Sequence, residues 1–283
     1  MNERDTIAIL ANPLGNRKKI NQFFDVIEAK LNSKGISYLY FKENWPTDIN
    51  SFRECWIIGG DGTINYFLNF YKEIHIPLVL FKGGSGNDFA TMLYGKMNVS
   101  EQVDHVLTAE SKSIDAAQCN DKIFINGIGI GFDGEVLRSI KTVRFFGGHA
   151  GYLMAVIKQI FIYRERLLHI QSGSLDISEK FLLTMSCNTS TMGGGFKISP
   201  LSKLNDGLLN VVLAKPLSLF KRLRYLPVIE KGKHLHLDFI RHFTAAKISI
   251  SCSENMLAQI DGELIEGSEF QIKVLPGKYL FKY

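Results

Sequence analysis

The chain has 283 residues, of which 46% are hydrophobic and 22% are charged, so it can bury a substantial core and does not have the composition of a disordered protein. Its net charge is only +5 and its basic residues are interleaved with acidic ones, which argues against nucleic-acid binding. The four cysteines lack the spacing of a zinc site or a disulfide framework, and no apolar run reaches the roughly 20 residues of a membrane-spanning helix.

The first 115 residues alternate between strand and helix patterns. Strands are predicted where short apolar runs occur, and helices where apolar residues recur at helical spacing. The predicted strands are residues 6–11, 36–42, 54–60 and 76–82, and the predicted helices are residues 16–34, 63–73 and 87–95. This alternation is typical of a doubly wound α/β domain with a parallel sheet.

Beyond residue 115 the pattern changes to short strand-like runs separated by Gly, Asn and Ser, which predicts an antiparallel β domain. One long helical stretch, roughly residues 134–164, interrupts these strands. The segment GIGIGFDG (127–134) has glycines near the spacing of a dinucleotide-binding turn. We interpret it as a glycine-bearing strand, because no βαβ unit surrounds it.

Three polar loops follow predicted strands of the first domain: ANPLGN (loop 1, 11–16), GGDGT (loop 2, 59–63) and KGGSGNDFA (loop 3, 82–90). The carboxyl ends of parallel strands meet at one edge of a sheet, so we expect the three loops to converge on one crevice. Glycines allow a close backbone approach, and the helix starts offer free N–H groups to phosphate. The loops therefore predict a nucleotide site.

Several carboxylates lie in or beside glycine-containing turns, where they suit either chemistry or turn formation. Asp61 in loop 2 can bind Mg²⁺ or a hydroxyl group, and Thr63 can donate to phosphate. Asp-Gly is also a common turn pair, and IDGE (260–263) fits a plain hairpin turn with Asp-Gly at its tip. The residues alone leave both interpretations open.

Five ordered motifs resemble the diacylglycerol kinase/sphingosine kinase family of lipid kinases, most closely its soluble bacterial members. The resemblance extends from residue 11 to about residue 265 and rests on GGDGT, GSGNDFA, NGIGIGFDGEV, GGGFKISPLSKLNDGLLNV and IDGE. It implies a two-domain fold. Residues 1–115 would form an α/β nucleotide-binding domain like that of phosphofructokinases and NAD kinases, completed by a C-terminal strand at 276–283. Residues 116–275 would form an antiparallel β-sandwich that binds the lipid substrate.

The resemblance also implies roles for individual residues. Asp61, Glu263 and Asp261 would be catalytic, with the role of general base open between Asp61 and Glu263. Glu135 and Asp133 would lie near the lipid headgroup. A structural Mg²⁺ site would use the side chain of Asp206 and the carbonyl groups of Lys203 and Leu208. The nucleotide would be lined by Asn12, Gly59, Gly60, Gly62, Thr63, Gly84, Ser85, Asn87 and Asp88.

The implied activity is an ATP- and Mg²⁺-dependent transfer of the γ-phosphate to the hydroxyl of a diacylglycerol or a sphingoid base. We expect a cytoplasmic protein that works peripherally on the inner face of the membrane and binds no nucleic acid. The sequence is compatible with a homodimer and does not fix the oligomeric state. Two segments that mix basic and large apolar residues, 138–170 and 218–226, suit either a lipid surface or helices packed on the sandwich.

Two other functions remain open: a soluble-metabolite kinase like NAD kinase, and a catalytically silent lipid-binding protein of the same fold. The second alternative rests on departures from the family pattern. Lys82 and Ser85 replace a proline and a threonine, Tyr66 replaces a glutamate, Thr91 replaces an arginine, and loop 1 lacks the usual glycine spacing.

Overall fold

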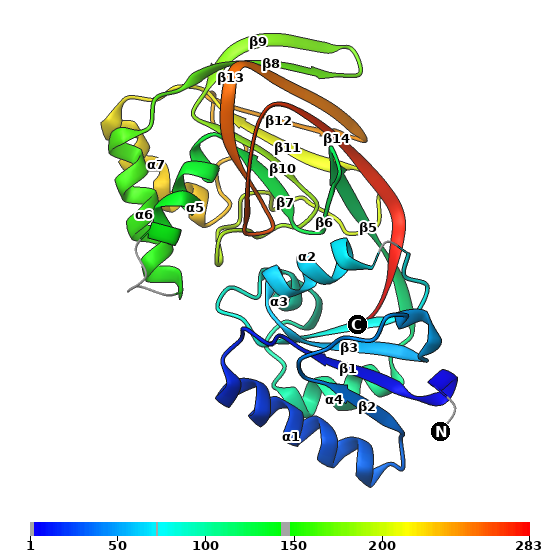
Figure 1. Cartoon of the computed structure of the whole chain (residues 1–283). Coiled ribbons are helices and arrows are strands. Elements are labelled where there is room, and N and C mark those ends of the chain that lie inside the picture. The colour runs from blue at the N-terminus through cyan, green and yellow to red at the C-terminus, as the bar shows by residue number, and fades with distance from the viewer. Residues whose placement is uncertain (1–2, 72, 143–147) are drawn as a thin grey trace. The chain divides into compact units, whose positions relative to one another are not determined.

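The computed structural model describes residues 3–71, 73–142 and 148–283. The chain divides into two compact units (Figure 1). Unit 1 comprises Met1–Ile114 together with Gly277–Tyr283, and unit 2 comprises Asp115–Pro276. The chain therefore passes between the units twice, within β5 (Ser111–Cys119) and within β14 (Glu263–Lys282). Sequence analysis places the corresponding boundaries one residue away, at 115/116 and 275/276.

Unit 1 is built on a parallel sheet with the strand order β2-β1-β3-β4 (Figure 1). Its apolar strands β1 and β3 are buried at every position, as expected of strands covered on both faces. The chain moves to one side of β1 for β2 and to the other side for β3. The elements are β1 (Ile7–Ala11), β2 (Tyr38–Phe41), β3 (Glu54–Gly59), β4 (Leu78–Lys82), α1 (Arg17–Ser33), α2 (Asp61–Phe70), α3 (Asp88–Tyr94) and α4 (Val99–Thr108).

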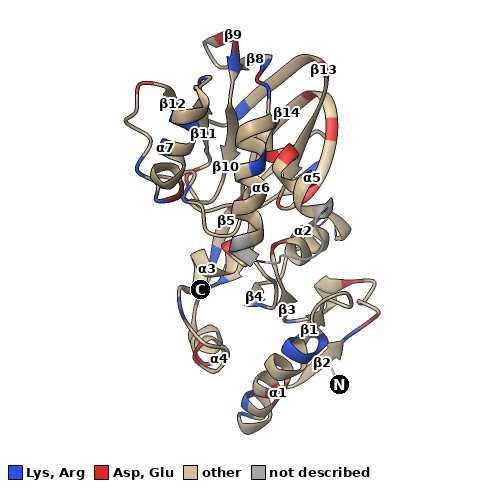
Figure 2. Cartoon of the chain, turned by 90° about the vertical axis from the view of Figure 1, so that its left-hand side faces the viewer, with Lys and Arg blue, Asp and Glu red and all other residues tan. Residues whose placement is uncertain are grey.

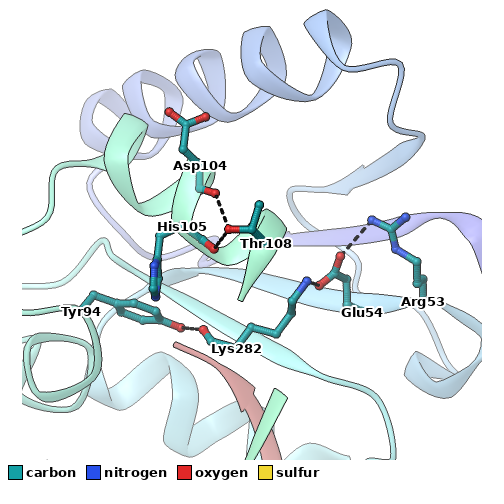
Figure 3. A network of polar contacts seen from close by, with 7 residues as sticks. All are labelled: Arg53, Glu54, Tyr94, Asp104, His105, Thr108 and Lys282. Atoms are coloured by element: carbon teal, nitrogen blue, oxygen red, sulfur yellow. Dashed lines mark hydrogen bonds and ion pairs between the residues drawn. The ribbon is translucent and has the colours of Figure 1, made fainter. Parts of the chain in front are cut away.

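The C-terminal end of β14 completes unit 1. Phe281 lies opposite Leu78 in a parallel pairing with β4. A buried charge pair holds this end in place, because the Lys282 ammonium lies 3.1 Å from the carboxylate of Glu54, whose side chain is only 3% exposed (Figure 3). Arg53 also pairs with Glu54 at 2.9 Å, and the Tyr94 hydroxyl donates to the Lys282 carbonyl at 2.9 Å.

Unit 2 contains an antiparallel sheet of order β12-β11-β10-β7-β13-β14 (Figure 1). The hairpin of β8 and β9 pairs with β13, and β5 pairs with both β14 and β6. Their inward side chains form one large apolar cluster. The strands are β6 (Lys122–Phe124), β7 (Gly127–Ile130), β8 (Arg166–Ser172), β9 (Leu175–Phe181), β10 (Leu183–Cys187), β11 (Leu209–Ala214), β12 (Ile240–Ala245) and β13 (Lys247–Ile260). The predicted combination of an α/β domain and an antiparallel β domain is confirmed.

Unit 2 also contains three helices, which pack against its sheet. They are α5 (Phe132–Thr142), α6 (Gly148–Ile162) and α7 (Leu219–Glu230). A second apolar cluster joins α6 and α7 to the sheet, with Met185 and Val212 from the strands, Tyr152 from α6 and Leu226 and Ile229 from α7. The helical stretch predicted at roughly 134–164 is observed as α5 and α6, whose outer limits lie two residues from the predicted ones. The helix starts at Phe132, and α5 and α6 are separate elements on either side of residues 143–147, which lie outside the described residues.

The segment 127–134 is a strand followed directly by a helix, so the predicted strand is confirmed only as far as Ile130. Its glycines allow close packing within unit 2. A Cβ at Gly134 would lie 2.5 Å from the backbone of Leu257, and one at Gly131 would lie 2.3 Å from the Tyr163 hydroxyl. These contacts explain the glycines without a bound dinucleotide. Among the described residues, no helix has the length and apolar character needed to cross a bilayer.

The Glu54–Lys282 pair predicts a large stability effect at the C-terminal end of β14. Lys282→Met should lower the free energy of unfolding by about 3 kcal/mol, because it leaves a buried carboxylate with only the half-exposed Arg53 as a partner. Lys278→Met is the matched control. It removes a pair with Glu73, which is 66% exposed, and should cost less than about 1 kcal/mol. Urea denaturation of both variants measures the difference, and equal losses would contradict this account.

Candidate functional site

The predicted convergence of the polar loops is observed in unit 1. Loop 1 meets loop 2 where the Asn12 amide donates to the Thr63 hydroxyl at 2.9 Å. The same hydroxyl accepts from the backbone N–H of Gly60 at 3.3 Å, and the N–H of Asn12 donates to the carbonyl of Ile58 at 3.2 Å. These contacts lie at the carboxyl ends of β1 and β3, between which the strand order reverses. In open α/β sheets this is the position where ligands bind.

Loops 2 and 3 touch backbone to backbone. The N–H of Gly83 donates to the Gly59 carbonyl at 2.8 Å. A Cβ built on Gly60 would lie 2.7 Å from the Cα of Gly84, and one built on Gly84 would lie 2.6 Å from the Cα of Gly60. Real Cβ atoms do not approach a backbone this closely, so both positions require glycine. The sequence identified Gly60 and Gly84 as ligand-binding glycines, and the structure gives them a packing role.

Asp61 is the first residue of α2 and joins loop 2 to the start of α3. Its Oδ2 accepts the N–H of Asp88 at 3.1 Å, and its Oδ1 accepts the N–H of Phe89 at 3.0 Å. These bonds satisfy two backbone donors of α3 and fix the orientation of the carboxylate. A carboxylate of fixed orientation at the start of α2 has the chemistry of an oxygen ligand for a metal or of an acceptor for a substrate hydroxyl.

Asn87 gives loop 3 its shape. It has a left-handed backbone with φ of 59°, and its side chain both accepts from the N–H of Gly84 at 2.8 Å and donates to the Gly84 carbonyl at 2.7 Å. Lys19 of α1 donates to the same carbonyl at 3.1 Å. Ser85 lies exposed at the tip of the loop. Sequence analysis missed Lys19, because a lysine in a basic helix start gives no signal of contact with a loop 65 residues away.

A cavity of about 260 Å³ lies beside loop 1 in unit 1. Its lining includes the amide side chain of Asn12 and two cations, Arg17 and Lys42. Glu43 is the one acid of the lining. Two cations and an amide at the ends of β1 and β2 suit an anionic ligand such as a phosphate group. Neither Arg17 nor Lys42 carried a motif, so the sequence did not identify this cavity.

The packing of loops 2 and 3 predicts opposite effects for two Gly→Ala substitutions. Gly84→Ala should destabilise the protein by about 1–3 kcal/mol, because its Cβ meets the backbone of Gly60. Gly62→Ala is the control, since nothing lies within 4 Å of a Cβ at this helical position, and it should be neutral or stabilise by up to about 1 kcal/mol. Chemical denaturation reports both values, and a Gly84→Ala protein as stable as the parent would exclude the backbone contact.

In unit 2, Asp261 and Gly262 form the tip of the hairpin between β13 and β14, both with positive φ. The Asp261 side chain is buried, and its carboxylate accepts three backbone N–H groups: Ile125 at 2.7 Å, Asn126 at 2.9 Å and Gly127 at 3.0 Å. Charged acceptors make strong hydrogen bonds, so this side chain ties the hairpin tip to the start of β7. The hairpin interpretation of IDGE is confirmed, and the turn also holds a predicted site residue.

Glu263 follows this turn as the first residue of β14 and is exposed. Its backbone is fixed by the strand pairing with Ile260. The hydrogen bonds of Asp261, two residues earlier in the chain, hold the same turn in place. The structure therefore gives Asp261 a positioning role and leaves the Glu263 carboxylate at the surface of unit 2. The catalytic roles assigned to both residues stay predictions.

An apolar cavity lies between the helices and the sheet of unit 2. Its volume is about 70 Å³, and its lining includes Phe132, Tyr152, Phe196 and Tyr225. The buried carboxylate of Asp133 belongs to this lining. Tyr152 donates to Asp133 Oδ1 at 3.0 Å, while Oδ2 has no hydrogen-bond partner within the described part of the chain. An acid with a free oxygen in an apolar cavity is suited to accept a hydrogen bond from a ligand.

The burial of Asp133 predicts a pH-dependent stability. Burial raises the pKa of its carboxyl above the ordinary value of 3.8 and outweighs the hydrogen bond from Tyr152, which lowers it. The folded state therefore binds this proton more tightly than the unfolded state, and stability is lost as pH rises from the unfolded to the folded pKa.

Asp133→Asn removes the buried charge and keeps the shape of the side chain. We expect it to raise the melting temperature at neutral pH and to leave it nearly unchanged near the unfolded pKa of the acid. Thermal unfolding followed by circular dichroism across the acid-to-neutral range measures this difference. A difference between the two proteins that does not vary with pH would contradict the burial argument.

The remaining predicted residues of unit 2 lie apart from this cavity or beside it. Glu135 is on α5, half-buried, and forms an ion pair with Arg138. Asp206 is exposed and accepts the N–H of Leu208 at 3.1 Å, within a loop that Asp115 closes by accepting the N–H of Gly207 at 2.6 Å. Oxygen ligands are those that Mg²⁺ prefers, so one carboxylate and the carbonyl groups of residues 203 and 208 fit the predicted metal by donor type.

Two of the departures from the family pattern, Lys82 and Tyr66, make local contacts in the structure. Lys82 donates to the carbonyl of Gly95 at the end of α3. Tyr66 is exposed on α2 and stacks on Phe70, with its ring edge against Trp45. These contacts leave the hydrogen bonds of Asp61 and Asn87 intact. The substitutions therefore do not disrupt the described geometry of loops 2 and 3.

Comparison with known proteins identifies two domain families along the chain. Residues 6–119 match the diacylglycerol kinase catalytic domain, and residues 126–280 match the YegS C-terminal NAD kinase β-sandwich-like domain. The second match covers more than half of the chain. A curated relative, the diacylglycerol kinase of Bacillus subtilis, is 26% identical over 229 residues, which are 80% of this chain and 73% of that protein.

Solved structures share the fold. A diacylglycerol kinase from Bacillus anthracis aligns with a TM-score of 0.75 at 22% identity, over 99% of this chain and 97% of that one. An NAD kinase from Archaeoglobus fulgidus, solved in complex with ATP, aligns with a TM-score of 0.58 at 13% identity, over 98% of this chain and 93% of that one. At these identities the likeness establishes the fold.

Proposed function

Because the chain belongs to the family of diacylglycerol kinases and YegS-like lipid kinases, we propose that it transfers the γ-phosphate of ATP to the hydroxyl of a diacylglycerol-type lipid. The family membership confirms the resemblance inferred from the five motifs. The identity of the nucleotide, of the metal and of the lipid goes beyond what family membership shows and is proposed. We place the enzyme in the cytoplasm, at the surface of the membrane.

The observation that favours a lipid over a soluble metabolite is the apolar cavity of unit 2 with Asp133 in its wall. An acyl chain can occupy an apolar cavity, and the free Oδ2 of Asp133 can accept a hydrogen bond from a hydroxyl group near the headgroup. The cavity is small as described, about 70 Å³, so binding requires its walls to separate. A diacylglycerol offers the required uncharged hydroxyl group. Glu135 pairs with Arg138, so it gives no specific support for a cationic sphingoid base.

The nucleotide site in this proposal is the edge of unit 1 where loops 1, 2 and 3 meet. The glycines of loops 2 and 3 leave no side chains at the contact, so the backbone can approach the phosphates closely. Asn12, Thr63 and Asn87 supply polar side chains at this edge, and the cations Arg17 and Lys42 line the neighbouring cavity. ATP bound to the NAD kinase of similar fold supports ATP as the donor by analogy of fold.

The transfer needs a carboxylate to accept the proton of the attacking hydroxyl. The lipid oxygen attacks the γ-phosphorus, the bond to the β–γ bridging oxygen breaks, ADP leaves, and the proton goes to the base. Mg²⁺, when bound, offsets the charge of the phosphates. Glu263 suits the role of base, because it is exposed at the start of β14 and its backbone position is fixed by the pairing with Ile260. Asp61 would then help to hold Mg²⁺ through its carboxylate.

The test is transfer of radiolabelled phosphate from Mg-ATP to a lipid panel in mixed micelles. The panel contains diacylglycerol, monoacylglycerol, phosphatidylglycerol, sphingosine and ceramide, with NAD assayed separately. We expect diacylglycerol to be labelled, and Glu263→Gln and Asp61→Ala to reduce kcat by at least about 100-fold each, the usual range for a lost general base or its equivalent.

Glu266→Gln is the matched control, because it makes the same change at another exposed position of β14 and should keep kcat near that of the parent. Labelling of NAD alone would replace the lipid kinase with a metabolite kinase. Lipid binding without transfer would indicate a silent binding protein. Labelling of sphingosine in preference to diacylglycerol would overturn the headgroup argument.

A further inference from the structure

Five aromatic side chains of unit 1 gather around Trp45. The ring centroids of Tyr66, Phe67, Phe70 and Tyr71 lie 5.5, 5.9, 6.4 and 6.5 Å from the centroid of Trp45. We refer to these five residues as the Trp45 cluster. Phe67 and Tyr71 are buried, so core packing accounts for them. Tyr66 and Phe70 are exposed, and core packing does not account for them.

The exposed part of the Trp45 cluster is flat. Tyr66 and Phe70 are 58% and 52% exposed, and their rings stack on each other with centroids 5.7 Å apart and planes inclined by 21°. Single exposed apolar residues are common on protein surfaces. Two stacked rings together present a larger apolar surface, which gains free energy when another ring covers it. This surface therefore suits a ligand that contains a flat ring.

Trp45 joins this surface to loop 1. Its indole N–H donates to the carbonyl of Ala11 at 3.1 Å, where β1 ends and loop 1 begins. Tyr66 follows Thr63 of loop 2 by three residues, and the Thr63 hydroxyl accepts from the Asn12 amide at 2.9 Å. Ala11 and Asn12 also line the cationic cavity beside loop 1. The exposed rings thus lie beside the edge of the sheet where loops 1 and 2 meet.

The charges at this edge are divided between the two helices that follow the loops. α1 begins with Arg17, Lys18 and Lys19, whereas α2 carries no charged residue after Asp61 (Figure 2). Lys19 reaches loop 3 through the carbonyl of Gly84, and Arg17 lines the cavity beside loop 1. A ligand at this edge therefore meets cations on the side of α1 and exposed aromatic rings on the side of α2.

A nucleoside triphosphate matches both sides, because it joins a polyanion to a flat aromatic base. Bases stack on aromatic side chains, and the contact tolerates different bases because each has a π-face. Tyr66 stands where the family pattern has a glutamate. A carboxylate accepts hydrogen bonds but has no ring face, so this chain has a stacking surface in place of an acceptor.

We propose that Tyr66 binds the base of the phosphate donor by stacking, and that Trp45 is the positioning residue that holds the Tyr66 ring beside loop 1. Tyr66 is assigned in preference to Phe70 because it lies one helical turn nearer to loop 2. A stacking subsite recognises the flat face of a base, so it accepts adenine and guanine alike. The role of the bound nucleotide as phosphate donor rests on the proposed function. The binding of a base rests on the Trp45 cluster and loop 1.

Isothermal titration calorimetry of the full chain with Mg²⁺ and ATP, GTP or tripolyphosphate tests the proposal. We expect ATP and GTP to bind within about threefold of each other, and tripolyphosphate at least about tenfold more weakly, because it lacks the base that stacks. Tyr66→Ala should weaken ATP binding at least about tenfold and leave tripolyphosphate binding unchanged. In the lipid kinase assay the same variant should raise the KM for ATP by a similar factor.

Two matched variants separate the ring of Tyr66 from the fold of unit 1. Tyr66→Phe keeps the ring and should bind ATP as the parent does. Phe70→Ala removes an exposed ring of the same helix farther from loop 2, and it should also keep parental ATP binding. Thermal unfolding of each variant reports its stability.

Trp45 supplies a spectroscopic readout. The other tryptophan, Trp56, is fully buried in β3, so a base that stacks on Tyr66 approaches Trp45 alone. ATP should quench the tryptophan fluorescence of the parent, and tripolyphosphate should not.

A loss of ATP binding in Tyr66→Ala, with parental stability and parental tripolyphosphate binding, supports the proposal. Parental ATP binding in Tyr66→Ala overturns it, as does an equal weakening of ATP and tripolyphosphate binding, or the same loss in Tyr66→Phe or Phe70→Ala. A preference of at least about 100-fold for ATP over GTP also overturns it, because such discrimination requires hydrogen bonds to the edge of the base.

The outcomes for the base subsite and for the kinase function are distinguishable. If Tyr66 controls ATP binding but no lipid is labelled, the proposed kinase function fails and the base subsite stands. If a lipid is labelled and Tyr66→Ala has the parental KM for ATP, the base subsite fails and the kinase function stands.

Discussion

The contact between the backbones of Gly60 and Gly84 is the constraint on which unit 1 depends. Two strand ends can come this close only where neither residue has a side chain. The approach brings the Asp61 carboxylate within hydrogen-bond distance of the first N–H groups of α3, and it places Asn87 where it can close loop 3. The polar groups at this edge of the sheet are therefore arranged by packing before any ligand is present, which is the preorganisation that phosphate transfer requires.

In unit 2 the site residues are held in place by a charged side chain and its hydrogen bonds, and not by close packing of two backbones. The Asp261 carboxylate collects three backbone N–H groups from residues 125–127 and so fixes the hairpin from which Glu263 projects. Two of the acids that the motifs identify, Asp61 and Asp261, thus accept hydrogen bonds from backbone N–H groups. Asp133 has one oxygen without a hydrogen-bond partner in the described part of the chain, and this oxygen is the basis for its assignment as the headgroup acceptor. Glu263 is assigned as the base because it is exposed and holds a fixed position on the hairpin.

The sequence predicted the elements of the parallel sheet well, because apolar runs and helical spacing in this half are strong and local. It also predicted that the three loops converge, since that follows from strand direction alone. It placed the end of β7 and the start of α5 less well, because this junction depends on close contacts such as that of Gly134 with Leu257, far away in sequence. Lys19, Tyr152 and the cationic pocket lining were missed for the same reason. Their partners are set by tertiary structure and leave no local pattern.

The assignment of Gly277–Tyr283 to unit 1 has a consequence for synthesis on the ribosome. The strand that pairs with β4, and the lysine that neutralises the buried Glu54, are translated only after all of unit 2. Until then the edge of β4 is open and a buried acid lacks its main counterion. The later half of the chain can thus acquire its fold before the earlier half is finished, which reverses the order in which consecutive domains ordinarily mature. An exposed sheet edge that persists through translation is a site for chaperones to shield.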